Sequence, residues 1–319
     1  MADYDVMILG AGSVGCVIGG YLASTGASVL LVNRRADTMV AVAEKGLRLE
    51  TEAGMMHTTP DACLAADARP ARIVMCFTKT PDTEQALNSI LPVISKDTIM
   101  VSMQNGLGNG QLLSALTGCD VLHGVTLIPA TLLAPAHIRS HGAKTSWLGP
   151  LAPDNDRQIK AAQQLAKMLD NAGIETEYHD DVLPAIWQKA CFNVAMNGIS
   201  ALADASPGLI GDTPALHEQA HALADEALQI SARLNIALDG DKVHQMIDFA
   251  CSEHRFHQPS MLQDIRASRH TEIDALNGYI MRTAEQIGID VPLNRMITGW
   301  CLHVRTPRHS GHHSHASNG

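Results

Sequence analysis

The sequence has few aromatic residues and no long apolar run. Phenylalanine, tryptophan and tyrosine make up 3% of the 319 residues, so the cores must be built from the aliphatic residues that dominate the 46% hydrophobic fraction. No stretch approaches the roughly 20 apolar residues of a membrane span, and the first residues do not combine a basic segment with a long apolar run. We therefore expect a soluble, cytoplasmic protein with no membrane partner.

Excess positive charge and paired cysteines are also missing. A formal net charge of −10 argues against a nucleic-acid partner, which would need a basic surface. The seven cysteines are widely spread and never form a CxxC pair. This spacing predicts reduced packing residues and neither a zinc site nor a disulfide framework. We expect no metal site.

A glycine-rich turn near the start of the chain carries the first functional signal. The apolar run Tyr4–Leu9 is typical of a strand and leads into GAGSVG. A helical pattern then covers Val14–Thr25, and Ser28–Val32 is a second buried strand. This order is that of a dinucleotide-binding unit, in which the glycines bring backbone close to a pyrophosphate at a helix N-terminus. The predicted cofactor contacts are Gly10, Ala11, Gly12, Ser13, Val14 and Gly15.

The residues after the second strand bear on the choice of cofactor. An NAD-binding protein usually places an acid there to hold the ribose hydroxyls, whereas this chain has Asn33, Arg34 and Arg35. Two guanidinium groups without a carboxylate favour the 2′-phosphate of NADP. The alternative is that both arginines are ordinary surface residues of a loop.

Further strands predict a doubly wound parallel sheet. Arg72–Phe77 and Thr98–Ser102 are apolar runs with a helix, Asp82–Leu91, between them. Polar clusters follow both runs, Lys79-Thr80 after the first and Gln104 to Gly108 after the second, where ligands of such sheets bind. Turn chemistry is the alternative, since Asn-Gly is a common turn pair. The remaining elements expected to extend the sheet are strands 121–126, 138–141, 145–148 and 175–178, with a helix over 156–172.

The second half shows only helical periodicity. The length of the whole chain, 319 residues, also exceeds what one core usually supports. We predict a Rossmann-type α/β domain over 1–179, an all-helical domain over 180–305 and a disordered His-rich tail over 306–319. Besides the helix described next, the expected helices cover 214–234, 241–253, 261–269, 271–287 and a last one from residue 293.

The helix predicted over Trp187–Leu202 opens the second domain and has an unusual polar stripe. Lys189, Asn193 and Asn197 are four residues apart, so they share one helix face within an otherwise apolar segment. An unpaired ammonium or amide in such a setting is costly. The stripe should therefore face a polar site between the domains, unless it is simply the solvated face of an amphipathic helix.

Taken together, these motifs resemble the ketopantoate reductase (2-dehydropantoate 2-reductase) family. The resemblance rests on the order of GAGSVG, Asn33-Arg34, Lys79, QNGLG, WQKACFNVAMN and SMLQDIRASRHTEIDALNG, and it extends over the chain up to the tail. It implies NADPH-dependent reduction of ketopantoate to pantoate, a step toward pantothenate and coenzyme A.

The resemblance also implies roles for individual residues. Lys189 would be the general acid, and Glu272 would lie beside the cofactor and help to orient Lys189 and the site. Asn193, Asn197 and Ser260 would contact the substrate. Lys79, Asn105 and Ala130 would line the NADP site, Asn105 touching the substrate as well. Asp264 and Asp274 are expected to form salt bridges or caps, and for Glu272 the alternative is a surface helix acid.

The lysine suits ketone chemistry on physical grounds. Hydride addition builds negative charge on the ketone oxygen, which a nearby cation stabilises and protonates. With an ordinary pKa of about 10.4, a lysine is charged and ready as an acid.

One position departs from the family pattern. Pro207 stands where a further polar substrate contact is usual, so the substrate stays open between ketopantoate and another 2-oxo acid handled by a paralogous NADP-dependent 2-hydroxyacid dehydrogenase. A nucleotide-sensing protein without chemistry is a further alternative, although it would have no need for both Lys189 and Glu272. A homodimer is one alternative for the oligomeric state.

Overall fold

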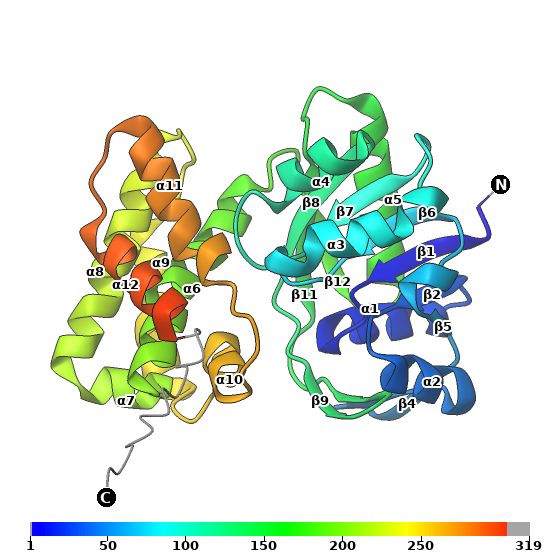
Figure 1. Ribbon diagram of the computed structural model, residues 1–319, viewed down its shortest axis with the longest axis horizontal. Coiled ribbons are helices and arrows are strands. Elements are labelled where there is room, and N and C mark those ends of the chain that lie inside the picture. Colours follow the sequence, from blue (N-terminus) through cyan, green and yellow to red (C-terminus); the bar gives the residue numbers. More distant parts are fainter. Residues whose placement is uncertain (1, 305–319) are drawn as a thin grey trace, which may run out of the picture.

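The computed structural model describes residues 2–304, which form a sheet-based half and a helical half (Figure 1). The predicted tail over 306–319 lies outside the described residues. The predicted domain limits, 1–179 and 180–305, stay a prediction. The predicted fold class, a Rossmann-like α/β half followed by an all-helical half, is confirmed.

The first half is organised around an eight-stranded sheet. Its order is β12-β11-β8-β7-β6-β1-β2-β5. All neighbours pair in parallel except β11 with β8, which are antiparallel, so the sheet is mixed and not wholly parallel as predicted. The strands are β1 (Tyr4–Leu9), β2 (Val29–Val32), β5 (Asp61–Cys63), β6 (Ala71–Cys76), β7 (Ile99–Ser102), β8 (Asp120–Thr126), β11 (Thr145–Pro150) and β12 (Glu175–Tyr178).

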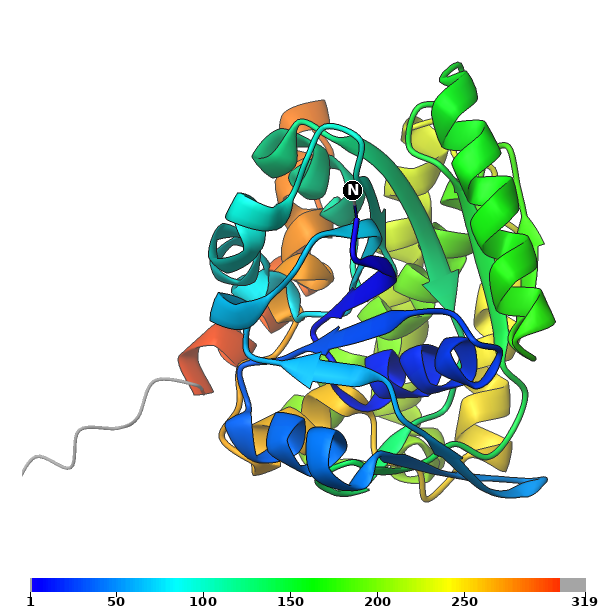
Figure 2. The same ribbon diagram turned by 90° about the vertical axis from the view of Figure 1, so that its right-hand side faces the viewer.

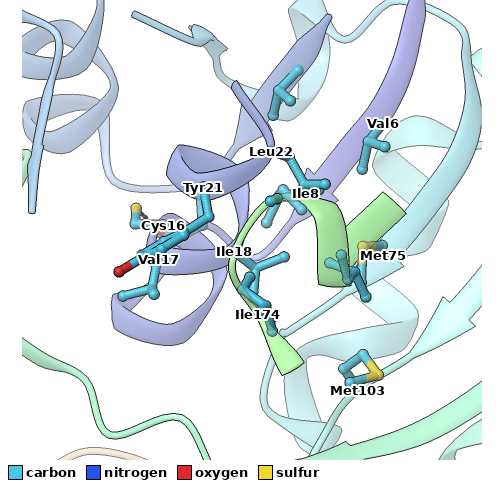
Figure 3. Packing of buried hydrophobic residues seen from close by; sticks show 14 of the residues in the cluster. Val6, Ile8, Cys16, Val17, Ile18, Tyr21, Leu22, Met75, Met103 and Ile174 are labelled. Atoms are coloured by element: carbon cyan, nitrogen blue, oxygen red, sulfur yellow. Dashed lines mark hydrogen bonds between the residues drawn. The ribbon is translucent and has the colours of Figure 1, made fainter. Parts of the chain in front are cut away.

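Helices cover both faces of this sheet (Figure 2). They are α1 (Ser13–Ser24), α2 (Ala36–Lys45), α3 (Thr80–Ile90), α4 (Asn109–Thr117) and α5 (Asp156–Asn171), with short 3-10 turns η1 (Ala65–Asp67) and η2 (Leu91–Val93). Alternate residues of β1 serve the two faces, as the period of a strand requires. Ile8 packs with Ile18 of α1 (Figure 3), whereas Met7 packs with Leu87 of α3.

A second, four-stranded sheet corrects part of the prediction. It comprises β3 (Leu47–Thr51), β4 (Gly54–Thr58), β9 (Thr131–Ala134) and β10 (His137–Arg139), in the order β4-β3-β10-β9. The run predicted as strand 138–141 therefore does not extend the main sheet. It pairs with β3, a partner distant in sequence that no local pattern identifies.

The second half contains helices alone among its described residues. They are α6 (Leu183–Ala203), α7 (Pro207–Asp212), α8 (Pro214–Arg233), α9 (Gly240–Glu253), α10 (Ser260–Arg266), η3 (Ile273–Ala275), α11 (Asn277–Ile287) and α12 (Pro292–Val304). Their apolar side chains form a core of their own, which also takes in Leu107 from the first half. None of the helices within residues 2–304 has the length and apolar character that a bilayer crossing demands.

The single helix predicted over 271–287 was wrong. The chain instead makes the turn η3 and breaks at Leu276, where φ is −109° and ψ is −95°, before α11 begins. Buried Asn277 donates hydrogen bonds to Val194 O and Asn294 Oδ1, which hold the start of α11 on α6 and α12. These partners lie far away in sequence, so helical periodicity alone could not reveal the break.

The loop after β7 joins the two halves. Leu107 N donates to Ala275 O at 3.0 Å, and the Leu107 side chain is buried in the helical core. Gly106 adopts a φ of +91°, and a Cβ on this residue would lie 2.8 Å from Ala275 O. Gly106 therefore permits both the turn and the close approach of the helical half.

Replacing Gly106 by Ala should loosen this junction. We expect Gly106→Ala to lower the free energy of unfolding by roughly 1–3 kcal/mol more than Gly118→Ala, because only the first creates an overpacked contact. Gly118 is a matched control, since it also has a positive φ, +64°, but has open space around its Cβ position. Urea unfolding of both variants makes the comparison, and equal losses would contradict the docking role of Gly106.

Candidate active site between the two halves

The glycine turn has the geometry of a dinucleotide site. Gly10 has a φ of +92°, and a Cβ there would meet Thr78 N at 2.5 Å. A Cβ on Gly15 would lie 2.9 Å from Ile8, which explains the close packing of α1 on β1. A Cβ on Gly12 would lie 3.9 Å from Gly10 O, an ordinary contact, and among the described residues no side chain caps the N-terminus of α1. Its backbone N–H groups can thus receive an anionic group such as a pyrophosphate.

The residues after β2 have internal partners. Asn33 Nδ2 donates to Ala11 O at 2.7 Å and so braces the glycine turn. Arg34 pairs with Asp82 of α3 at 3.2 Å, and Arg35 pairs with Asp37 at 2.8 Å. Both arginine side chains are largely exposed, so these pairs are weak and both guanidinium groups can reach a ligand at this edge.

Lys79 follows β6 and reaches into the helical half. Its Nζ lies 2.5 Å from Asp264 Oδ1 of α10 and donates to His270 O at 3.0 Å. Asp264 is 5% exposed and also pairs with Arg269. The expected salt-bridge role of Asp264 is confirmed, as is that of Asp274, which pairs with Arg282.

Glu272 is buried next to the loop after β7. Asn105 Nδ2 donates to Glu272 Oε2 at 3.5 Å, and only 9% of Glu272 is exposed. Burial raises the pKa of Glu272 to about 7, while the positive charges of Lys79 and Lys189 oppose that rise. The alternative of a surface helix acid is therefore wrong.

Lys189 reaches the opposite way, from α6 to the main sheet. Its Nζ donates to Thr126 O, at the end of β8, at 2.7 Å. Burial lowers the pKa of Lys189 to about 8, and the negative charge of Glu272 partly offsets this. The pKa is thus well below the ordinary value assumed from the sequence.

The other predicted site residues differ in their burial. Asn193 is half-buried and Asn197 is buried, one and two turns along α6 from Lys189, so the stripe is not a solvated face. Ser260 is exposed at the first position of α10, one turn before Asp264. Ala130 is half-buried, just before β9.

Parallel pairing explains why these groups converge. The strands β1, β2, β6, β7 and β8 run in one direction, so their carboxyl ends share one edge of the sheet. The glycine turn, Asn33, Lys79, Asn105 and Thr126 follow or end these strands. From the other half, α6, α10 and the start of η3 bring Lys189, Asp264 and Glu272 to this edge.

One group in this cluster was not predicted from the sequence, and another has a different environment from the one predicted. Thr126 acts through its main-chain carbonyl oxygen, which no residue pattern can mark. Gln104 is buried and donates to Thr78 O and Thr83 Oγ1, so it supports the loop from below. The sequence predicts Gln104 in a polar cluster along the cofactor, whereas its side chain is turned toward Thr78 and Thr83.

A cavity of about 190 Å³ lies at the same junction; Gln104 and Gly106 to Gly108 help to line it, but its lining does not include Lys189, Glu272 or Asn105. Leu107, His123, Trp187 and Tyr279 are among its lining residues. The convergence of charged groups, and not this cavity, therefore locates the candidate site.

Two family models cover most of the chain. Residues 6–153 match the model described as ketopantoate reductase PanE/ApbA, and residues 181–304 match that of its C-terminal part. A 2-dehydropantoate 2-reductase of Pyrococcus horikoshii is 30% identical over 297 residues, covering 93% of this chain and 95% of that protein. One of Archaeoglobus fulgidus is 30% identical over 292 residues, covering 92% and 95%.

Solved structures agree with these matches. A ternary structure of D-mandelate dehydrogenase with NADH and anilino(oxo)acetate has a TM-score of 0.88 at 27% identity and covers 94% of this chain and 98% of that chain. A PanE/ApbA family ketopantoate reductase from Ralstonia eutropha has a TM-score of 0.86 at 29% identity, with the same coverage.

The raised pKa of Glu272 makes folding stability depend on pH. Since its folded pKa is about 7 against an ordinary 4.5, the folded state holds the proton more tightly, and stability falls as pH rises from 5 to 8. Glu272→Gln removes this titration. The stability of wild type relative to Glu272→Gln should drop by on the order of 2 kcal/mol over this range. Denaturant unfolding of both proteins at pH 5 and 8 measures it, and a constant difference would contradict a buried, raised carboxyl.

Proposed function

The chain belongs to the ketopantoate reductase PanE/ApbA family, and we propose that it reduces ketopantoate to pantoate with NADPH in the cytoplasm. The family is one of oxidoreductases, comprising 2-dehydropantoate 2-reductases and related 2-hydroxyacid dehydrogenases. A binding protein without chemistry therefore does not suit this chain. We also propose that a homodimer is the assembly to test first.

One observation carries the proposal. The ammonium of Lys189 crosses from α6 to Thr126 O, at the sheet edge that also bears the glycine turn. Glu272 lies close enough for the two opposite charges to influence each other's pKa. We propose that this cation faces the nicotinamide ring of a bound cofactor.

The residues present fit a bound nicotinamide dinucleotide, which supplies hydride to the ketone carbon when bound. Lys189 would stabilise the negative charge that develops on the ketone oxygen and donate the proton that completes the alcohol. An ammonium has three N–H donors. One is held by Thr126 O, so the other two can serve the substrate.

The lowered pKa suits an acid that works near neutrality. At about 8, the amine of Lys189 is still mostly protonated at pH 7 and gives up its proton more readily than an exposed lysine. We propose that the negative charge of Glu272 keeps Lys189 protonated despite burial.

Substrate binding is assigned to the polar residues around this pair. We propose that Asn105, Asn193, Asn197 and Ser260 contact the carboxylate and hydroxyl of the substrate. Lys79 is already neutralised by Asp264 at 2.5 Å, so it is better suited to orient Glu272 and line the cofactor than to bind a carboxylate. Ala130 completes the cofactor lining.

One observation favours a second substrate class. Pro207 is buried at the first position of α7 and offers no side-chain hydrogen bond where the family pattern has a polar contact. We propose that an apolar distal group of the substrate would suit this position better than a hydroxyl, and a structure of the similar D-mandelate dehydrogenase holds NADH and anilino(oxo)acetate. The second candidate is therefore reduction of another 2-oxo acid with an apolar side chain.

Lys189→Ala tests the mechanism on either substrate. We expect wild type to oxidise NADPH faster with ketopantoate than with branched and aromatic 2-oxo acids. In Lys189→Ala, the kcat for the best substrate should fall by about 10²–10⁴-fold, because the general acid is lost. Wild-type kcat/KM should also decline above pH 8, as Lys189 loses its proton.

Gln188→Ala is the matched control, because Gln188 lies on the same helix but contacts Met246. It should keep kcat near wild type. An unchanged kcat in Lys189→Ala would contradict the role of Lys189 as general acid. If kcat falls as expected but the best substrate is an aromatic 2-oxo acid, only the choice of ketopantoate as substrate is wrong.

The cofactor proposal predicts that Arg34→Ala raises the KM for NADPH about tenfold or more, because one charge-assisted contact to the 2′-phosphate is lost. The KM for NADH should stay nearly unchanged, since NADH has no 2′-phosphate. Arg72→Ala is the control, since Arg72 is equally exposed and pairs with Asp5 away from the site. Steady-state kinetics with both cofactors makes the test. Comparable wild-type kcat/KM for NADH and NADPH would mean that Arg34 and Arg35 do not hold a phosphate.

A further inference from the structure

A seam of histidines and aspartates joins α8 and α9, away from the residues assigned above. His217, His221 and Asp225 follow one another at four-residue spacing on α8, so they form one stripe. His244 and Asp248, also four apart, face them from α9. Pairs of ligands one turn apart on two facing helices are a common way to build a metal site in a helical bundle.

Three of these side chains direct one ligand atom each to a common point. His217 Nε2 and His221 Nε2 lie 2.9 and 3.0 Å from Asp248 Oδ1 and 3.3 Å from each other. Tetrahedral zinc with bonds of about 2.0–2.1 Å separates neighbouring ligands by about 3.3 Å. We propose that His217, His221 and Asp248 bind a divalent transition-metal ion of the zinc class.

The neighbouring groups favour the tautomer that this site needs. His221 Nδ1 lies 2.6 Å from His244 Nδ1, and His244 Nε2 lies 3.0 Å from Asp225 Oδ1. With the metal on Nε2 of His221, its Nδ1–H donates to His244, whose own Nε2–H donates to Asp225. A ligating histidine almost always has such a partner for its second nitrogen, ending here in a carboxylate.

The expected consequence is a clamp between two helices. Two ligands come from α8 and one from α9, and both helices pack on α6, which carries Lys189. Asp248 is largely exposed, so an ion can enter from solvent and keep water at the remaining position. The prediction of no metal site rested on cysteine spacing and did not consider this histidine stripe.

Zinc-dependent thermal stability tests the proposal on the full-length protein. After chelator treatment, saturating Zn²⁺ should raise the Tm of wild type by several degrees, because an ion that binds only the folded state stabilises it. This zinc-dependent rise in Tm should be lost in His221→Ala and in Asp248→Asn. The second substitution keeps the size of the side chain and removes only the negative charge of the ligand. Titration calorimetry should show one fewer zinc site in both variants.

His254→Ala is the matched control, since His254 lies at the end of α9 outside the seam, and it should keep the full rise. The histidines between residues 306 and 319 are present in every protein, so any zinc they bind is common to all. The proposal is overturned if zinc does not raise the Tm of wild type, or if it raises the Tm of both seam variants as much as that of wild type. The seam is then only a hydrogen-bonded contact.

Discussion

The structure depends on holding two opposite charges in the junction between a sheet and a helical domain. Lys189 and Glu272 both come from the helical half, and burial shifts the pKa of each toward its neutral form. Each side chain has a hydrogen-bond partner on the sheet side. Thr126 O accepts a hydrogen bond from Lys189, and Asn105 donates one to Glu272. Because a buried charge without such partners is costly, this pair stabilises the arrangement in which the two halves are docked.

That requirement explains the loop between β7 and α4. Asn105 faces Glu272, while Leu107 is buried in the helical core and Gly106 allows the backbone to reach Ala275. The same few residues thus hold the domains together and supply a polar group to the candidate site. Lys79 and Asp264 form a second link, parallel to the first, between the end of β6 and α10. Packing and electrostatics at this junction therefore cannot be varied independently.

The two shifted pKa values also suit the proposed reaction. An amine near 8 and a carboxyl near 7 exchange protons more readily at neutral pH than their ordinary counterparts would. The seam joins α8 and α9, which both pack on α6, so a metal ion bound there would act on this site through the packing of that helix.

Local pattern in the sequence determined the glycine turn, most strands of the main sheet, the polar stripe of α6 and the helical second half. These follow from residue periodicity, glycine placement and capping, which act within a few residues. Only the tertiary structure decided that strand 138–141 joins a separate sheet, that the chain breaks at Leu276, and that Thr126 O receives Lys189. It also decided the pKa values, because desolvation depends on which distant segments cover a group and not on its neighbours along the chain.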